Sequence, residues 1–407
     1  MRPLRQTIPL AEALRLTIAA AEPIVRTERI PLANANGRVL AQAIVASADV
    51  PPFSRAAMDG FAVRSADTAG ATRSEPRALR CIDSIFTGQA PARTVGPGEC
   101  AQIATGAPVP EGADAVVMVE ETDKADGSSA DGDVLVMNPV SPRQNISRQG
   151  SDITAGEQLL AAGDVLSPSR VGVCAAAGYA HVHAYARPVV AIVSTGGEIV
   201  EPGQPLGAAQ IYDINRYTLP AIVEGHGGEP RVLRSAADAL PDLTQILLEA
   251  AASADIIVFS GGSSVGDKDL VLDVLRENGE VLFHGIAVKP GKPTALGRVN
   301  GRPVLGMPGN PTSCLSNAYL LLVPMLRRMA RLPDYRPRTV TVPLSARITS
   351  SAGRHQFYTV RVEGETAIPA FKSSGDITSM SRADGYVEVD ATTEFVEAGT
   401  PVEVKLF

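Results

Sequence analysis

The sequence predicts a multidomain protein that combines an α/β domain with separate β-rich domains. Three observations support this prediction. The chain has 407 residues, more than one hydrophobic core usually serves. Strands and helices alternate over residues 188–332, as in a three-layer α/β domain with a largely parallel sheet. Short strands and turns fill residues 51–140, and strand-like sequence runs from about residue 336 to the end, which indicates an inserted β-rich domain and a small C-terminal β-barrel.

These patterns divide the chain into four domains. Residues 1–50 and 141–187 together form a discontinuous N-terminal linking domain, because the inserted domain at residues 51–140 interrupts it. Residues 188–332 form the α/β domain, and residues 333–407 form the C-terminal β-barrel.

Short local patterns place several elements. VVAIV and DIIVF are apolar runs of strand length and are expected to be buried strands. Asn300-Gly301 is a strong signal for a two-residue hairpin. DKADGSSADGD, residues 123–133, predicts an exposed hairpin tip in the inserted domain. Pro220 should delay or kink a helix expected after Asn215.

Apolar residues at helical spacing predict four further helices. The first begins near Leu10 and ends at Pro23. The second has Pro241 near its start, LVLDVLREN forms the third with Gly279 closing it, and Pro311 of PGNP begins the last. The apolar stripe of the second helix consists of Leu243, Ile246, Leu247, Ala250 and Ala251.

Composition narrows the class of function. Aromatic residues make up 4% of the chain, with no Trp, and the net charge is −7, so nucleic-acid binding is not expected. The four cysteines are widely spaced, which indicates reduced thiols. No apolar run reaches membrane-spanning length, and we expect a cytoplasmic protein. The five histidines are scattered along the sequence: His181, His183, His226, His284 and His355. His181 and His183 fall at strand spacing on one face, but without a third ligand they are interpreted as packing or surface residues.

Three turns that follow predicted strands are poor in side chains. They are STGGE (Ser194–Glu198), SGGSSVGDKD (Ser260–Asp269) and GMPGNPTS (Gly306–Ser313). Glycine leaves backbone N–H groups exposed, and a following helix N-terminus adds partial positive charge. Open parallel sheets bind ligands at this edge. Together the turns predict a site for a phosphorylated ligand, although each alone is more often plain turn chemistry.

Charged residues on and near these turns add a metal ion to the prediction. Lys289 and Lys292 in VKPGKP suit anion binding. Glu198, Asp267 and Asp269 would repel phosphates unless a divalent cation lay between, so Mg²⁺ is expected. The alternative is that these aspartates cap the helix beginning near residue 270, which we consider credible for Asp267 and less so for Asp269.

Longer stretches resemble one family. SGGSSVGDKD, VKPGKP and GMPGNPTS are similar, in this order and spacing, to the molybdopterin-binding domain of molybdopterin molybdenumtransferases, the MoeA-type proteins and the C-terminal domain of gephyrin. PPFSRAAMDGFAV, IATGAPVPEGADAVVMVEE, RQGSDITAGEQLLAAGDVL and STGGEIVEPGQPLGAAQIYDINRY also resemble its signatures. With GRHQFYTVRV and KSSGDITSMSRADGYVEV in the tail, the resemblance covers essentially the whole chain.

The resemblance implies an activity and an assembly. It implies an enzyme that binds adenylylated molybdopterin and molybdate, inserts molybdenum between the dithiolene sulfurs with Mg²⁺, and releases AMP. It also implies an elongated homodimer, in which the second domain of one subunit faces the molybdopterin-binding domain of the other. The molybdopterin adenylyltransferase is the pathway enzyme expected as a further partner.

The resemblance also assigns residues by motif. Asp59 and Thr105 belong to the second domain and Asp152 to the connecting segment, whereas Asp59-Gly60 by itself favours an ordinary turn. The implied catalytic residues are Asp59, Glu198, Asp269 and Lys289, and the implied metal ligands are Asp59, Asp152, Glu198 and Asp269. The implied substrate-binding residues are Thr105, Ser260, Gly261, Gly262, Ser264, Lys292, Pro308, Gly309, Asn310, Pro311, Arg354 and Ser374.

Two other interpretations stay open at the level of sequence. One is molybdopterin adenylylation on the same α/β fold, which would require ATP and would leave the other motifs without a role. The other is a non-catalytic, pterin-binding scaffold, which is favoured by departures from the family pattern. These departures lie at Ser54, Ser151, Gly197, Ser235, Ala236 and Gly285.

Overall fold

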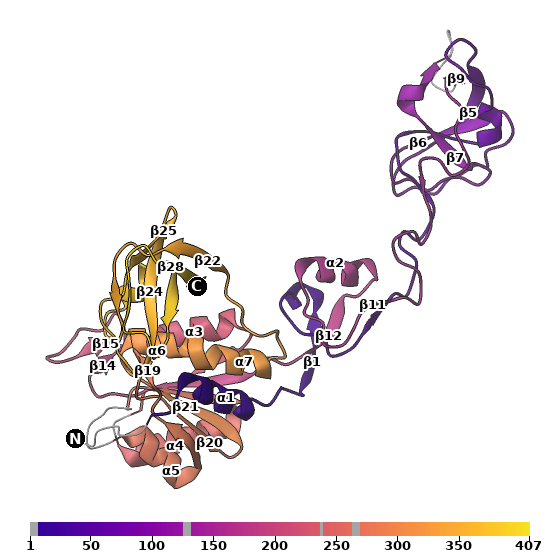
Figure 1. Ribbon diagram of the computed structural model, residues 1–407. Helices are drawn as coiled ribbons and strands as arrows, with labels where there is room; N and C mark the ends of the chain where they lie inside the picture. Colours follow the sequence, from indigo (N-terminus) through magenta and orange to yellow (C-terminus); the bar gives the residue numbers. More distant parts are fainter. Residues whose placement is uncertain (1–6, 125–131, 237–238, 263–268) are drawn as a thin grey trace. The chain divides into compact units, whose positions relative to one another are not determined.

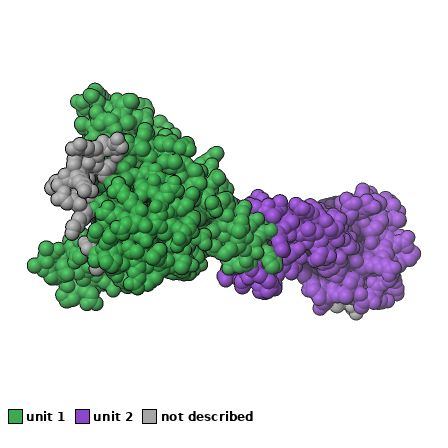
Figure 2. Space-filling model, turned by 90° about the horizontal axis from the view of Figure 1, so that it is seen from below, with its two compact units in different colours: residues 1–28, 37–41, 183–407 green, residues 29–36, 42–182 purple. Residues whose placement is uncertain are grey.

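The computed structural model describes residues 7–124, 132–236, 239–262 and 269–407. The chain forms two compact units (Figure 2). Unit 1 comprises Met1–Glu28, Gly37–Ala41 and His183–Phe407, and unit 2 comprises Arg29–Asn36 and Gln42–Val182. The chain passes between them within β1 (Thr27–Pro31), again on either side of Gly37–Ala41, and finally within β12 (His181–Tyr185). No helix in the described part of the chain is long and apolar enough to span a bilayer. The division into four domains stays a prediction.

A six-stranded sheet forms the centre of the α/β part of unit 1. The first four strands in its order run parallel, and the fifth, β20, is antiparallel to both of its neighbours, β21 and β18. The expected hairpin at Asn300-Gly301 joins β20 to β21, and both residues have the positive φ that a tight two-residue turn requires. The strand order is β16 (Glu229–Val232), β13 (Val189–Ser194), β17 (Ile256–Ser260), β21 (Arg302–Met307), β20 (Ala295–Val299) and β18 (Glu280–His284).

Helices cover both faces of this sheet (Figure 1). Val190 and Ile192 of β13 pack with one set of helices, while Ala191 and Val193 pack with the other, because alternate residues of a strand face opposite sides. The three-layer prediction is therefore confirmed. The first set is α1 (Leu10–Ala20), α3 (Asn215–Gly225), α6 (Pro311–Asn317) and α7 (Val323–Met329), and the second is α4 (Leu240–Ser253) and α5 (Leu270–Asn278).

The helix predictions are confirmed with two differences. All five residues of the expected stripe on α4 are buried. The helix after Asn215 is not delayed by Pro220, which lies inside it, because the Asp213 carboxylate accepts the Arg216 N–H at 3.0 Å and begins the helix upstream. The last predicted helix is interrupted by a π-helical stretch, η4 (Ala318–Leu322), between α6 and α7.

The C-terminal strands close into a small barrel, as predicted. Strands β24, β26, β28 and β22 are hydrogen-bonded in this order, and β25 pairs with β24. A bridge between Leu344, which follows β22, and Ala367 of β25 completes the ring. Both residues belong to the apolar core of the barrel. The elements are β22 (Thr339–Pro343), β23 (Ile348–Thr349), β24 (His355–Glu363), β25 (Thr366–Pro369), α8 (Thr378–Ser381), β26 (Gly385–Val389), β27 (Phe395–Val396) and β28 (Pro401–Leu406).

Unit 2 contains the predicted β-rich insert. Its six-stranded sheet has an apolar cluster on each face, one containing Val63 and Val117 and the other Ala62 and Val116. β8 and β9 pair on either side of the expected hairpin tip, whose residues 125–131 lie outside the described residues. The sheet order is β7 (Ala115–Met118), β4 (Gly60–Val63), β6 (Glu99–Ile103), β5 (Arg77–Ile85), β9 (Asp133–Val136) and β8 (Thr122–Lys124).

The remainder of unit 2 is built from short elements. Two-stranded pairs link segments that flank the insert, and a nine-residue helix begins with Ser167 as its N-cap and proline next. These elements are η1 (Leu32–Asn34), β2 (Ile44–Val45), β3 (Arg55–Ala56), η2 (Ser65–Thr68), η3 (Val119–Glu121), β10 (Ile146–Ser147), β11 (Gln158–Leu160) and α2 (Pro168–Ala176).

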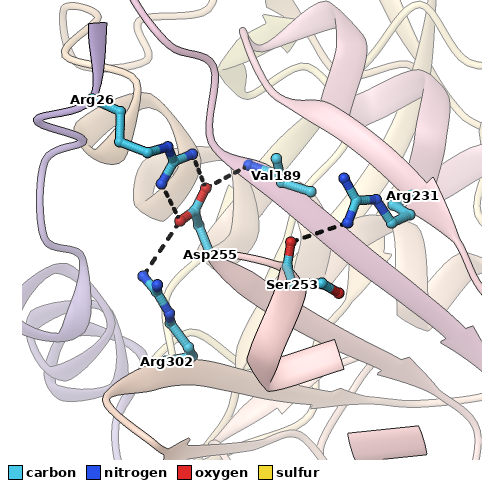
Figure 3. Close-up of polar contacts among 6 residues, drawn as sticks. All are labelled: Arg26, Val189, Arg231, Ser253, Asp255 and Arg302. Atoms are coloured by element: carbon cyan, nitrogen blue, oxygen red, sulfur yellow. Dashed lines mark hydrogen bonds and ion pairs between the residues drawn. The ribbon is translucent and has the colours of Figure 1, made fainter. Parts of the chain in front are cut away.

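An ion-pair cluster fastens the segment after α1 to the sheet of unit 1 (Figure 3). Asp255, which precedes β17, has a side chain that is 3% exposed. Arg26 donates to both of its carboxylate oxygens, at 2.8 and 2.7 Å. Arg302 reaches Oδ1 at 3.3 Å, and the Val189 amide donates to Oδ2 at 2.9 Å. Burial raises the pKa of Asp255, but these partners outweigh it and lower the pKa overall.

Candidate active site

The three glycine-rich turns meet at one edge of the α/β sheet. The strands that precede them pair in register, with Ser194 opposite Ser260 and Ser260 opposite Met307. The turns that follow these residues therefore lie side by side at the carboxyl ends of parallel strands. This is the edge at which the sequence predicts a ligand site.

Glycine is required where the turns touch. Gly261 has φ +98°, and a Cβ there would lie 2.4 Å from the Thr195 carbonyl oxygen. Gly262 has φ +66°, and a Cβ there would lie 2.9 Å from Thr195 Oγ1. A Cβ at Gly309 would be in contact with the Gly261 Cα, at 3.4 Å. The glycines thus serve close packing of the turns as well as backbone exposure.

A cavity of about 770 Å³ opens at these turns, and we call it the turn pocket. Apolar, hydroxyl and amide groups line most of it. Its charged residues in the described part of the chain are the two carboxylates Glu198 and Asp213. Its lining also includes eight of the sequence-predicted residues: Glu198, Ser260, Gly261, Gly262, Pro308, Gly309, Asn310 and Pro311.

A second cavity of about 430 Å³ adjoins the turn pocket and shares Pro293, Pro308 and Asn310 with it. We call it the cationic pocket. No acidic residue in the described chain lines it, and hydroxyl groups of three serines complete its polar wall. Its charged residues are Lys289, Lys292, Arg354 and Lys372. The two pockets therefore have opposite charge character.

The loop that carries the two lysines is held from both sides. Gly291 has φ +103°, and its carbonyl accepts a hydrogen bond at 2.8 Å from the buried Asn317 amide. On the other side, β19 (Val288–Lys289) pairs with β24 of the barrel, and Lys289 Nζ donates to Ser351 Oγ at 2.9 Å. The charge of Lys289 is thus fixed in place before a ligand arrives.

The tail segment reaches the same pockets. The Asn310 side-chain amide donates to Ser374 Oγ at 2.9 Å, and the Thr312 backbone amide donates to the Ser374 carbonyl at 3.1 Å. Arg354, Ser374 and Lys372 line the cationic pocket beside the lysine loop. The structure therefore brings the predicted tail residues together with PGNP and VKPGKP.

Comparison with known proteins matches three successive stretches of the chain. Residues 8–178 match the MoeA N-terminal region (domain I and II), residues 191–328 a probable molybdopterin binding domain, and residues 341–407 the MoeA C-terminal region (domain IV). The chain belongs to the MoeA family. A relative from Mycobacterium tuberculosis named molybdopterin molybdenumtransferase 2 is 36% identical over 405 residues, covering 97% of this chain and 96% of its own length.

Other members of the MoeA family are similar over the full length. A molybdopterin molybdenumtransferase from Staphylococcus aureus is 31% identical over 408 residues, covering 99% of this chain and 96% of its own length. The crystal structure of a molybdopterin biosynthesis MoeA protein from Pyrococcus horikosii has a TM-score of 0.83 with 38% identity, covering 98% of this chain and 99% of that one.

Asp269, a residue implied by the MoeA resemblance, has both carboxylate oxygens engaged. Oδ1 accepts the Leu272 amide at 3.1 Å, so Asp269 is the N-cap of α5, and Oδ2 lies 2.9 Å from His284 Nε2. Our preference against a cap at this position was wrong, because the helix begins at the next residue. The sequence did not single out His284, which lies against this carboxylate. Asp267 and Ser264 lie outside the described residues.

Asp59 and Thr105, two of the MoeA-type residues of unit 2, are hydrogen-bonded to each other. Asp59 Oδ1 accepts the Thr105 amide at 2.6 Å and the Thr105 hydroxyl at 2.9 Å, and these bonds lower the pKa of the exposed Asp59 carboxyl. Gly60 does not serve a turn: it begins β4, and a Cβ there would lie 1.8 Å from the Val117 carbonyl oxygen. Asp152 is exposed in the connecting segment.

Several lining residues of the two pockets were not among the predicted site residues, and three of them carry chemistry that bears on the ligand. Asp213 and Asn215 of the IYDINRY stretch line the turn pocket, and Lys372 of the tail lines the cationic pocket. Asp213 and Asn215 stand after a short strand, β15 (Ile211–Tyr212), which pairs with β14 (Ile199–Val200). The sequence did contain a signal for Asp213 and Asn215, because both lie in the STGGEIVEPGQPLGAAQIYDINRY stretch, which resembles the family.

Proposed function

We propose that this protein inserts molybdenum into adenylylated molybdopterin, using molybdate and Mg²⁺ and releasing AMP. The observation that carries the proposal is the pairing of two adjoining pockets of different charge at the strand ends. A substrate with a heterocycle, phosphates and a metal oxyanion needs both kinds of surface. The names of full-length relatives support this assignment.

The cationic pocket is suited to molybdate. Three lysines and an arginine line it together with serine hydroxyls, and no carboxylate among the described lining residues opposes an anion. Replacement of one molybdate oxo group by two dithiolene sulfurs releases one water, whose protons come from the two thiols. Hydrolysis of the pyrophosphate link consumes one water and releases AMP. Both steps need bound, oriented anions and no protein nucleophile.

The donors present are compatible with Mg²⁺. Among the described residues there is no group of three or more His, Cys, Asp or Glu side chains that could hold a metal ion. Mg²⁺ commonly binds through one or two carboxylates together with substrate phosphates, so such a group is not required. Glu198, exposed in the turn pocket, would hold the ion, which neutralises phosphate charge when bound. Asp59, Asp152 and Asp269 remain proposed ligands.

We also propose a homodimer in which Asp59 of one subunit serves the pockets of its partner. The Asp59 carboxylate is exposed and held ready by Thr105, as a residue that acts on an external ligand would be. Mixing inactive Asp59→Ala and Lys289→Ala proteins would restore about a quarter of wild-type activity, since half the dimers would be mixed and each would contain one intact site. No recovery would contradict the shared site.

The decisive experiment is direct. Purified protein is incubated with adenylylated molybdopterin, Mg²⁺ and molybdate, and both AMP release and activation of an apo-molybdoenzyme are measured. We expect both signals from the wild type and from Arg231→Ala, an exposed control outside both pockets, and neither from Arg354→Ala. AMP release that requires ATP would favour the adenylyltransferase, and pterin binding without AMP release would favour the scaffold.

A further inference from the structure

The wall of the turn pocket contains four buried polar side chains with an unpaired atom each. Within the described chain, no hydrogen-bond partner lies within reach of these atoms. Every one of the four side chains belongs to a residue that is at least nine-tenths buried and lines the pocket. Buried polar atoms are nearly always satisfied, so their concentration at one cavity indicates a ligand. The atoms are Ser194 Oγ, Thr195 Oγ1, Asp213 Oδ2 and Asn215 Oδ1.

The orientation of Asp213 is set by the helix it begins. Its Oδ1 accepts the Arg216 amide at 3.0 Å, which caps α3, and its residue is 6% exposed. The cap fixes the carboxylate, and its second oxygen, Oδ2, has no partner within the described chain. Asp213 lines the turn pocket and also a smaller cavity of about 250 Å³, in which Arg216 and Arg234 are further lining residues. A buried carboxylate oxygen without a partner is unfavourable, whereas the capping oxygen is satisfied. Oδ2 is therefore an acceptor that a ligand N–H group would complete.

The orientation of Asn215 is equally defined. Its Nδ2 donates to Gly309 O at 2.8 Å and to Ser260 Oγ at 2.7 Å. Because the Gly309 carbonyl can only accept, the nitrogen must face it, and the side-chain oxygen Oδ1 is left as an acceptor. Two unpaired acceptors thus belong to side chains that lie two residues apart and line the same pocket, beside hydroxyl groups that can donate or accept.

The two unpaired acceptors indicate which hydrogen-bonding groups a ligand of this pocket would carry. No lysine or arginine among the described lining residues offers a counter-ion in this pocket, so the bound part need not be anionic. Two fixed acceptors match two adjacent donors. The 2-amino group and ring N3–H of a pterin are such a pair, with a carbonyl beyond them for a hydroxyl to contact. Adenine offers one amino group beside a ring acceptor and matches less well.

We propose that Asp213 and Asn215 recognise the 2-amino and N3–H edge of the pterin ring, so that Asp213 is a specificity-determining residue. This inference rests on the proposed function, because it assumes a pterin substrate. It adds to that function the residues that would bind the pterin ring. It also separates the tasks of the two acids in the turn pocket: Glu198 is exposed, while Asp213 is buried.

The test compares two small heterocycles by calorimetry with the full-length protein. Pterin has the 2-amino group, and lumazine has a carbonyl oxygen in its place. Wild-type protein should bind pterin about 10- to 100-fold more tightly than lumazine, because a hydrogen bond to a charged group is lost and two acceptors then face each other. Asp213→Asn can still cap α3, and its amide can donate to the lumazine oxygen, so this preference should vanish or invert.

Two controls complete the design. Glu249→Gln, an exposed change on α4 outside the pocket, should keep the wild-type preference. Binding of AMP should be unaffected by Asp213→Asn. Equal binding of pterin and lumazine by the wild type, an unchanged preference in Asp213→Asn, or a loss of AMP binding instead would each overturn the inference. Because AMP release from the full substrate is measured separately, the proposed function stands or fails independently.

Discussion

Replacing Arg26 by alanine should destabilise unit 1 by leaving a buried carboxylate short of its main partner. Arg26 makes two hydrogen bonds to Asp255, at 2.8 and 2.7 Å, and the Asp255 side chain is 3% exposed. Figure 3 shows the three polar partners that surround this carboxylate. Removing one partner of a buried ion pair leaves a desolvated charge that only the remaining partners can offset.

The magnitude follows from what remains. Loss of a partner from a buried pair usually costs about 3–5 kcal/mol. The Val189 amide at 2.9 Å and Arg302 at 3.3 Å stay in place, and Arg26 itself is 48% exposed. We therefore expect Arg26→Ala to lower the free energy of unfolding by about 2 kcal/mol, less than the usual loss because two partners persist. Arg302→Ala, which removes one longer contact, should cost under about 1 kcal/mol.

Urea denaturation followed by tyrosine fluorescence measures the unfolding of unit 1, which contains Arg26 and Asp255. The chain has no Trp and 8 Tyr residues, of which Tyr179 alone lies in unit 2. The matched control is Arg231→Ala, an exposed arginine that donates at 3.1 Å to the Ser253 carbonyl in the same region. Its expected effect is within about 0.5 kcal/mol. Equal shifts for Arg26→Ala and Arg231→Ala would refute the reasoning.

Three further predictions concern the described groups. Gly261→Ala should lower stability by roughly 1–3 kcal/mol and abolish AMP release, because its Cβ would meet the Thr195 carbonyl. Thr105→Val should raise the pKa of Asp59 toward its ordinary value, as followed by NMR titration, since one of the bonds that lower it is removed. The pKa of Asp255 is lowered from 3.8 in the folded protein, so the ionised carboxylate stabilises the fold above that pH. This stabilisation is lost as the pH falls through the pKa of the folded state. The difference in the free energy of unfolding between wild type and Asp255→Asn should therefore narrow at acid pH.

Each of these has its own check. Gly364→Ala, at a turn with φ +58° and nothing within 4 Å of the added carbon, introduces backbone strain without the clash, so it should cost less than Gly261→Ala. An unchanged carboxyl titration in Thr105→Val would show that the hydroxyl does not act on Asp59. If the difference in the free energy of unfolding between wild type and Asp255→Asn grew at acid pH, the prediction for Asp255 would be wrong in sign.

Much of the fold could be predicted because the relevant signals are local. VVAIV and DIIVF are apolar throughout, as strands buried on both faces are, and the Asn300-Gly301 turn has a strong conformational preference. The glycine-rich turns could be located by their position after these strands. Their convergence follows from a general rule for parallel sheets, which needs no knowledge of individual contacts.

The finer structure of the site could not be predicted because it depends on partners distant in sequence. His284 contacts Asp269 across fifteen residues and a helix, and nothing in the spacing indicates this pair. Helix boundaries decide whether an aspartate caps or binds, and a shift of two residues exchanges Asp267 for Asp269. Asp213 was passed over because a single acid in a polar stretch is unremarkable until its burial is known.

Because β19 pairs with β24, the α/β part and the C-terminal barrel together form the surface of the cationic pocket. In an isolated α/β domain with the same glycine turns, the lysine loop would lack the barrel strand and Ser351 that anchor Lys289, and the turn pocket would lack Gly375 from its lining. Arg354 and Lys372 would be absent altogether. Under the proposed function, truncation at residue 333 should therefore weaken the binding of molybdate more than the binding of pterin.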